Sequence, residues 1–312
     1  MLRGWRDNGR IMTTTPDSAA LADRVPLSAA ALSAALTGPG RLWRDLTVRA
    51  ETGSTNSDLL AAARAGAAEG TVLAAEVQTA GRGRLDRRWI CPPRAALSFS
   101  ALLRPDGVPA VARGWIPLLA GVAVAAGLRA QAGLDARLKW PNDVLVGGAK
   151  IAGILAEQAG DAIVLGIGIN VTTRRDELPV PHATSVVLAG AAPDREQLLV
   201  AVLGELETWY RRWVAAVAAG PPVVAGPVLA GPVLAGTAAA GTALAGPGGD
   251  PAGLRAEYLR LSATVGQQVR VSMPGGKLVT GRAGDVDATG RLEVGTASGP
   301  VAVSAGDVVH VR

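Results

Sequence analysis

The sequence predicts an α+β domain followed by a small all-β barrel. Up to about residue 262, short β-branched runs alternate with longer apolar or amphipathic segments of helical length. From Gly266 onward, five short β runs follow one another, separated by glycine turns, which is typical of a small barrel. A hydrophobic fraction of 49% in 312 residues supplies enough apolar surface for both cores.

In the first third of the chain, strands are expected around one short helix and one basic loop. The helix begins at Ser54 or Thr55, either of which can cap it with Asp58 as the capping-box partner, and ends near Arg64. The loop, Gln78–Arg94, is polar and contains glycine. The expected strands are Leu42–Arg49, Thr71–Val77 and Leu97–Leu103.

In the middle of the chain, the sequence predicts one buried helix, four short strands and two further helices. The buried helix, about Ile116–Ala132, contains an apolar run that is too short to span a membrane. Asp194 caps a helix that ends near Val214, and Asp250-Pro251 can begin another that ends near Leu261. The four strands are Ala136–Trp140, Val144–Val146, Ile151–Gln158 and Ala162–Ile169.

These elements divide the chain into a disordered or poorly structured tail (1–40), a larger domain (41–262) and the barrel (263–312). The larger domain carries an insertion at about 219–250, in which an Ala-Gly pair recurs every five residues among prolines. Such a repeat cannot hold a continuous helix through lipid, so we expect a flexible insertion. The expected barrel strands are Gln268–Ser272, Leu278–Asp285, Arg291–Val294, Pro300–Val303 and Val308–Val311.

The composition excludes several classes of protein. A single cysteine, Cys91, excludes an intramolecular disulfide framework and a thiolate zinc site, and it fits a reducing cytoplasm. Two distant histidines, His182 and His310, argue against a histidine-rich metal centre and against a Ser-His-Asp triad. The first 24 residues lack the apolar core of a secretory signal. The net charge of +5 follows an arginine-rich composition and is poor evidence for nucleic-acid binding.

Three segments carry the chemistry. Gly81–Trp89 places four arginines and two glycines in nine residues, which suits close approach to phosphate, although a basic surface turn explains it about equally well. Lys139–Asp143, followed by Lys150, places two of only three lysines near a turn, where a lysine serves either as a solvated edge residue or as a phosphate or carboxylate partner. Glu51–Asn56 offers free N–H groups at a helix N-terminus, but alone it favours a plain cap.

Other signatures are absent from the sequence. Neither Gly275-Gly276-Lys277 nor the glycines before Lys150 are followed by Ser or Thr in the frame of a phosphate-binding P-loop. The segment Gly166–Asn170 lacks the third glycine of a dinucleotide fingerprint and predicts a buried strand that ends in an asparagine.

Taken together and in this order, these segments resemble biotin protein ligases of the short form, which lacks an N-terminal DNA-binding domain. The resemblance covers roughly residues 42–312 and implies a catalytic domain similar to class II aminoacyl-tRNA synthetases, with a mixed sheet backed by helices, and an SH3-like C-terminal domain. The matching motifs are Gly53-Ser54-Thr55-Asn56, Gln78 before Gly81-Arg82-Gly83-Arg84 and Trp89, Lys139-Trp140-Pro141-Asn142-Asp143, Lys150 with Gly153-Ile154-Leu155, and Gly166-Ile167-Gly168-Ile169-Asn170.

The resemblance also implies a reaction and its participants. ATP and biotin are the substrates, with Mg²⁺ and without a tightly bound prosthetic group. Biotinyl-5′-AMP forms first, and the biotin then passes to a lysine of a biotin carboxyl carrier domain of a biotin-dependent carboxylase, in the cytoplasm. The expected protein is a monomer or weak homodimer that binds neither a membrane nor DNA sequence-specifically, since only about 45 residues precede the first motif strand.

Residue roles are carried over position by position, with no metal-ligating side chain among them. The biotin-binding set implied is Ser54, Thr55, Asn56, Gln78, Arg82, Gly83, Arg84, Lys150 and Gly153. The ATP- and adenylate-binding set is Arg84, Arg87, Trp89, Lys139, Asn142, Lys150 and Asn170. The catalytic set is Lys150, Arg84 and Asp143, the last beside the acceptor lysine. Asp86 departs from the family pattern, which often has glycine there.

Two alternatives remain open at this point. A lipoate or octanoate ligase or transferase of related fold is disfavoured by the doubled Gly-Arg loop and the terminal barrel. An RNA-associated basic protein is disfavoured because the chain from Gly266 onward has no aromatic residue and therefore no stacking platform for bases.

Overall fold

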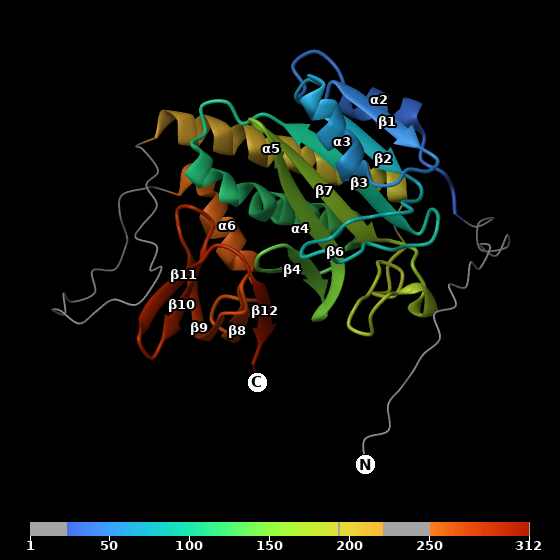
Figure 1. Ribbon diagram of the computed structural model, residues 1–312. Coiled ribbons are helices and arrows are strands. Elements are labelled where there is room, and N and C mark those ends of the chain that lie inside the picture. The colour runs from blue at the N-terminus through green and yellow to red at the C-terminus, as the bar shows by residue number, and fades with distance from the viewer. Residues whose placement is uncertain (1–23, 193, 221–249, 312) are drawn as a thin grey trace.

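The computed structural model describes residues 24–192, 194–220 and 250–311, in which one large sheet carries helices on both faces and a smaller sheet follows (Figure 1). Residues 1–23 of the expected tail, and most of the expected insertion at 219–250, lie outside the described residues. The strands of the large sheet lie within residues 45–170, and those of the smaller sheet lie within residues 268–310.

The large sheet has seven strands in the order β1-β2-β3-β7-β6-β5-β4. β1 and β2 pair in parallel and every other neighbouring pair is antiparallel, so the sheet is mixed. β3, which lies next to the central strand β7, is buried along its whole length, which explains its nearly continuous apolar sequence. The strands are β1 (Asp45–Arg49), β2 (Thr71–Ala75), β3 (Ala96–Leu103), β4 (Ala136–Lys139), β5 (Asp143–Val146), β6 (Ala149–Ala159) and β7 (Ala162–Asn170).

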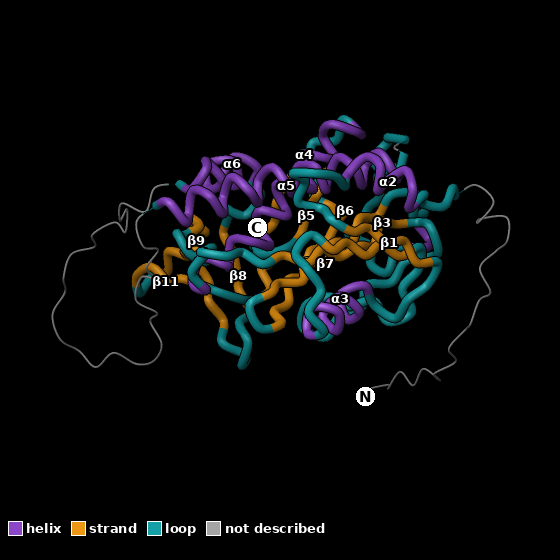
Figure 2. The backbone as a smooth tube through the Cα atoms, turned by 90° about the horizontal axis from the view of Figure 1, so that it is seen from above, coloured by secondary structure: helices purple, strands orange, loops and turns teal. Residues whose placement is uncertain are grey.

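The helices cover the two faces of this sheet unequally (Figure 2). α2 (Ala29–Leu36), α4 (Ile116–Ala132), α5 (Arg195–Ala219) and α6 (Leu254–Leu261) lie on one face, and α3 (Thr55–Arg64) lies on the other. The short helices are η1 (Ala110–Trp115), η2 (Arg175–Glu177) and η3 (Pro251–Gly253). The face under α3 is therefore only partly covered by helix.

Among the described residues, one helical stretch, Ala110–Ala132, is long and apolar enough to cross a membrane. Within its most apolar window, 72% is buried inside the protein, as in the core helix of a globular domain.

The C-terminal sheet has five antiparallel strands in the order β11-β10-β9-β8-β12. It contacts the large domain through two tryptophans: Trp140 Nε1 donates to Gly290 O at 3.1 Å, and Trp115 Nε1 donates to Asp287 O at 3.1 Å. These bonds fix the small sheet beside the turn that follows β4. Its strands are β8 (Gln268–Ser272), β9 (Leu278–Val286), β10 (Leu292–Thr296), β11 (Gly299–Val303) and β12 (Asp307–His310).

The structure corrects the expected tail. Residues 24–40 are ordered, because α2 is capped by Ser28 and buries Leu32 and Leu36 against the core. The expectation of a poorly structured segment over 1–40 is therefore wrong for residues 24–40.

Details of β1, α5 and α3 also differ from expectation. β1 begins at Asp45 rather than Leu42, because the Leu42 amide donates to Glu207 Oε1 at 2.7 Å and is engaged with α5. α5 continues to Ala219, beyond Val214. Ser54 caps α3 as expected, but Asp58 accepts hydrogen bonds from Arg49 and Thr52 instead of completing a capping box.

Candidate active site

One row of cross-strand partners runs across the large sheet and forms the floor of the candidate site. In register, Lys139 pairs with Asp143, Asp143 with Gly153, Gly153 with Gly168, and Gly168 with Ser98. The two adjacent glycines leave a strip of backbone without side chains between charged groups at one end and a buried hydroxyl at the other. This strip lies on the face that α3 only partly covers.

The N-terminus of α3 supplies a buried polar corner at one end of this floor. Gln78 Oε1 accepts from the Thr55 amide at 2.8 Å and from Thr55 Oγ1 at 3.1 Å. The Ser100 hydroxyl lies 2.7 Å from Thr55 Oγ1 and 2.6 Å from Asn56 Oδ1. Because Ser54 caps the helix, the polar groups of this corner are held by the helix start rather than by a free loop.

Asn56 is placed by a glycine in the sheet. A Cβ added at Gly166 would lie 2.1 Å from Asn56 Oδ1, so only glycine lets α3 approach the strand this closely. Asn56 Nδ2 donates to Leu155 O at 3.3 Å and to Glu157 Oε2 at 3.0 Å. Glu157 also pairs with Arg82 at 2.9 Å, which links α3, β6 and the basic loop.

The basic loop folds back over the floor, and its arginines reach different elements. Arg84 Nη1 donates to Asn142 Oδ1 at 2.9 Å, and burial, opposed in part by nearby Asp143, lowers the pKa of Arg84. Arg87 pairs with Asp307 of β12 in the small sheet. The loop therefore contacts both domains.

Trp89, at the end of this loop, lies against the glycine strip. A Cβ on Gly168 would be 2.3 Å from Trp89 Cε2, and one on Gly153 would be 3.4 Å from Trp89 Cζ3. The indole Nε1 is buried and has no hydrogen-bond partner. Polar atoms in this state carry a desolvation cost, so an acceptor brought beside Nε1 would be stabilised.

Two lysines and one carboxylate meet at the other end of the floor. Lys150 Nζ lies 2.6 Å from Asp143 Oδ1, and both side chains are partly buried. The pKa of Lys139 is lowered, chiefly by burial, while Asp143 opposes this effect and Lys150 adds to it. Such crowding of cations with one carboxylate makes the region receptive to anionic groups.

These groups surround one cavity of about 930 Å³. Every residue that the sequence places in the biotin, adenylate or catalytic sets lines it, so the structure brings all of them together. Their individual roles stay predictions.

Sequence reasoning missed several residues that line the cavity or contact the residues that line it. Ser98 and Ser100 alternate in an otherwise apolar strand, a signal that was available in the Ser-Phe-Ser pattern. Asp307 and His310 line the cavity from β12, and nothing in the sequence indicates that the small sheet approaches the site. Val180 lines it from the segment after η2.

Across residues 24–192, 194–220 and 250–311, no group of three or more His, Cys, Asp and Glu side chains is placed to hold a metal ion. The two carboxylates that line the cavity, Asp143 and Asp307, are each paired with a cation. Either carboxylate would have to give up its cation partner in order to ligate a magnesium ion directly.

Comparisons with known proteins agree with this arrangement. The model described as Biotin/lipoate A/B protein ligase family matches residues 52–173, and that described as Biotin protein ligase C terminal domain matches residues 264–311. The chain is 44% identical over 294 residues to the biotin–[acetyl-CoA-carboxylase] ligase of Mycobacterium tuberculosis, covering 93% of this chain and 97% of that protein.

One further relative and one solved structure are also similar to this chain. A bifunctional ligase/repressor of Bacillus spizizenii is 39% identical over 157 residues, which cover 47% of this chain and 48% of that protein. The structure of biotin protein ligase from Aquifex aeolicus in complex with biotin and ATP matches with a TM-score of 0.65 and 25% identity, covering 86% of this chain and 100% of that one. The α+β class with a mixed sheet and an SH3-like C-terminal domain is thereby confirmed. This chain belongs to the biotin protein ligase family.

Proposed function

We propose that this protein is a biotin–[biotin carboxyl-carrier protein] ligase, an enzyme that activates biotin with ATP and forms a carbon–nitrogen bond to a carrier lysine. The observation that carries this proposal is the convergence of five sequence motifs on one cavity, with a polar corner at one end and a cationic end at the other. This distribution matches a ligand that has a hydrogen-bonding ring and an anionic tail.

The polar corner suits the ureido ring of biotin. Thr55, Asn56 and Gln78 present amide and hydroxyl groups that both donate and accept, as a planar urea requires. Their mutual hydrogen bonds fix their orientation before a ligand arrives, which lowers the entropic cost of binding. Ser54 and Gly153 complete the walls around the ring and the alkyl chain.

The cationic end suits the first chemical step. A carboxylate oxygen of biotin attacks the α-phosphorus of ATP, a new P–O bond forms, and the bond to the bridging oxygen of pyrophosphate breaks. Lys150, Arg84 and Lys139 would stabilise the negative charge on the phosphate oxygens, and Arg87 and Asn142 would flank them. Mg²⁺, bound to the ATP phosphates, would neutralise further charge.

The adenine would lie near Trp89 and Asn170, which line the same cavity. The loop residues Arg82 and Gly83 would close over the adenylate and exclude water, since hydrolysis competes with transfer.

The second step transfers the biotinyl group to a lysine amine. The neutral amine attacks the acyl carbon of the mixed anhydride, AMP leaves with the electron pair of the broken C–O bond, and the amine loses a proton. Asp143 lies at the floor of the cavity, where its carboxylate could take up that proton. Cys91 does not serve as a nucleophile, because its thiol is buried and burial raises its pKa.

An exchange assay tests the first step. Purified protein is incubated with Mg²⁺-ATP and labelled pyrophosphate, and label in ATP is measured with biotin, with lipoate, with octanoate and with no acid. Exchange that depends on biotin supports the proposal. Exchange driven equally or better by lipoate or octanoate would move the protein to the related ligases.

We further propose that the protein acts in the cytoplasm on a biotin carboxyl carrier domain, as a monomer or weak homodimer, without sequence-specific DNA binding or membrane attachment. The arginines of the basic loop support the proposed absence of sequence-specific DNA binding. Each of them has a partner within the protein, so they do not form a free basic face: Arg82, Arg84, Arg87 and Arg88. A gel shift with salt-resistant, sequence-selective binding would contradict it. Sedimentation at several concentrations tests the oligomeric state.

A further inference from the structure

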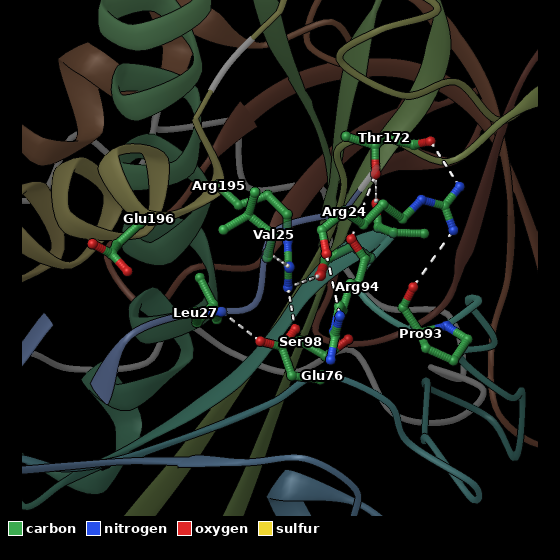
Figure 3. A network of polar contacts seen from close by, with 12 residues as sticks. Arg24, Val25, Leu27, Glu76, Pro93, Arg94, Ser98, Thr172, Arg195 and Glu196 are labelled. Atoms are coloured by element: carbon green, nitrogen blue, oxygen red, sulfur yellow. Dashed lines mark hydrogen bonds and ion pairs between the residues drawn. The ribbon is translucent and has the colours of Figure 1, made fainter. Parts of the chain in front are cut away.

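The segment 24–28, which precedes α2, is tied into the fold next to the candidate site (Figure 3). The Arg24 side chain is 5% exposed, unlike most arginines, and makes three polar contacts. Arg24 Nη2 pairs with Glu177 Oε2 at 2.7 Å and donates to Thr172 O at 3.1 Å, and Nη1 donates to Pro93 O at 3.5 Å. None of these residues was singled out by the sequence.

A second set of bonds holds the same segment to β2 and α5. The Leu27 amide donates to Glu76 Oε1 at 2.6 Å, and Glu76 Oε2 pairs with Arg195 at 2.7 Å. Both side chains of that ion pair are nearly inaccessible, and Arg195 also donates to Val25 O at 3.1 Å. Glu76 stands two residues before Gln78, so this set fixes the strand end that delivers the polar corner.

The Arg24 contacts lead toward Lys150 through a short stretch of chain. Glu177 ends η2 and also accepts from the Arg174 amide at 2.8 Å, which holds this turn together. The residues that follow, 178–184, pass along the cavity and pair with Lys150. The Lys150 amide donates to His182 O at 2.9 Å, and Lys150 O accepts from the Thr184 amide at 2.8 Å.

We propose that Arg24 is a positioning residue. It acts through Glu177 to hold segment 178–184 against Lys150, at the cationic end of the cavity. A charge-assisted, buried hydrogen bond is stronger than an exposed one, so its loss frees the segment without removing any group that touches substrate. The inference rests on the proposed function, because the affinity it predicts is that for ATP and the adenylate.

The test compares full-length variants. Arg24→Ala removes all the contacts, Glu177→Gln removes only the charge of the partner, and Arg24→Lys keeps a cation. Arg41→Ala is the matched control, because Arg41 pairs with Glu207 at 2.9 Å and neither residue lines the cavity. KM for ATP, kcat, the half-life of bound biotinyl-5′-AMP and hydrogen exchange of residues 178–184 are measured for each.

Arg24→Ala is expected to raise KM for ATP roughly tenfold and to shorten the adenylate half-life by a similar factor, with a smaller change in kcat. Glu177→Gln should also raise KM for ATP and shorten the adenylate half-life. Both quantities should lie between those of Arg24→Ala and wild type in Arg24→Lys, and they should equal the wild-type values in Arg41→Ala. Faster exchange of residues 178–184 should accompany the effect.

The inference is overturned if Arg24→Ala and Glu177→Gln both keep the wild-type KM for ATP, adenylate half-life and hydrogen exchange of residues 178–184. It is also overturned if Arg41→Ala changes these quantities equally. If Arg24→Ala does not fold, Glu177→Gln and Arg24→Lys decide alone. If the wild type forms no adenylate, the proposed function fails, and exchange of segment 178–184 in ligand-free protein still decides whether Arg24 holds it.

Discussion

Replacing Gly168 by alanine tests whether the glycine strip positions Trp89. The added Cβ would lie 2.3 Å from Trp89 Cε2, 2.6 Å from Cζ2 and 2.7 Å from Nε1. Carbon atoms in contact stand about 3.5–4.0 Å apart, so the indole must withdraw by more than about 1 Å. A misplacement of about 1 Å in an active site can cost about a hundredfold in rate, or roughly 2.7 kcal/mol of transition-state stabilisation.

The assay is biotin-dependent pyrophosphate exchange, with thermal unfolding followed in parallel. Gly204→Ala is the matched control, because Gly204 lies in α5 and an added Cβ there meets nothing within 4 Å. That control should keep full activity and gain up to about 1 kcal/mol of stability from helix propensity. Gly168→Ala should lose about a hundredfold while remaining folded.

A double mutant separates the Trp89 contact from other damage. On a Trp89→Ala background, the Gly168→Ala change should cost little more, since the atoms that it displaces are gone. Full activity of the single Gly168→Ala variant would refute the reasoning, and so would additive losses in the double mutant.

Three further outcomes are expected. Lys150→Ala should reduce adenylate formation by about 10²–10³-fold. It should change the free energy of unfolding by less than about 1 kcal/mol, because the ion pair of Lys150 with Asp143 is partly exposed. A large loss of stability with normal activity in the folded fraction would contradict this. Cys91, whose thiol is buried and whose pKa is raised chiefly by burial, should resist alkylation at neutral pH until the protein is unfolded by denaturant, and equal rates in both states would argue against it. Burial, aided by Lys139, lowers the pKa of His310. The stability that His310 contributes is therefore complete above the ordinary histidine pKa of 6.5 and declines as the pH falls below that value. Between pH 7.5 and 5.5, the free energy of unfolding should fall less for His310→Gln than for the exposed control His182→Gln, as measured by denaturant unfolding.

Much of the fold follows from local signals in the sequence. The strand at 97–103 and the helix at 116–132 were predictable because each is a long apolar run with a clear length and clear boundaries. The missed helix, α2, has alanines on nearly all sides, so its sequence shows no contrast between a buried and an exposed face. Its packing against α5 and β1 makes Leu32 and Leu36 core residues.

Part of the cavity lining was predictable from the sequence, and its arrangement was not. Ordered motifs identified Thr55, Gln78 and Lys150, yet the pairing of Gly153 with Gly168 depends on strand register, which a single sequence does not specify. The approach of Asp307 depends on how two separate sheets pack together. Such contacts join residues far apart in the chain, where local propensity carries no information.

The central claim is that this protein joins biotin to a carrier lysine. The most direct measurement is the intact mass of a biotin carboxyl carrier domain after incubation with the protein, Mg²⁺-ATP and biotin, beside a lipoyl domain with lipoate. The account predicts a single biotinyl adduct on the carrier and none on the lipoyl domain, with the adduct abolished by changing the acceptor lysine. Labelling of the lipoyl domain in preference to the carrier, or no adduct on either from folded protein, would contradict it.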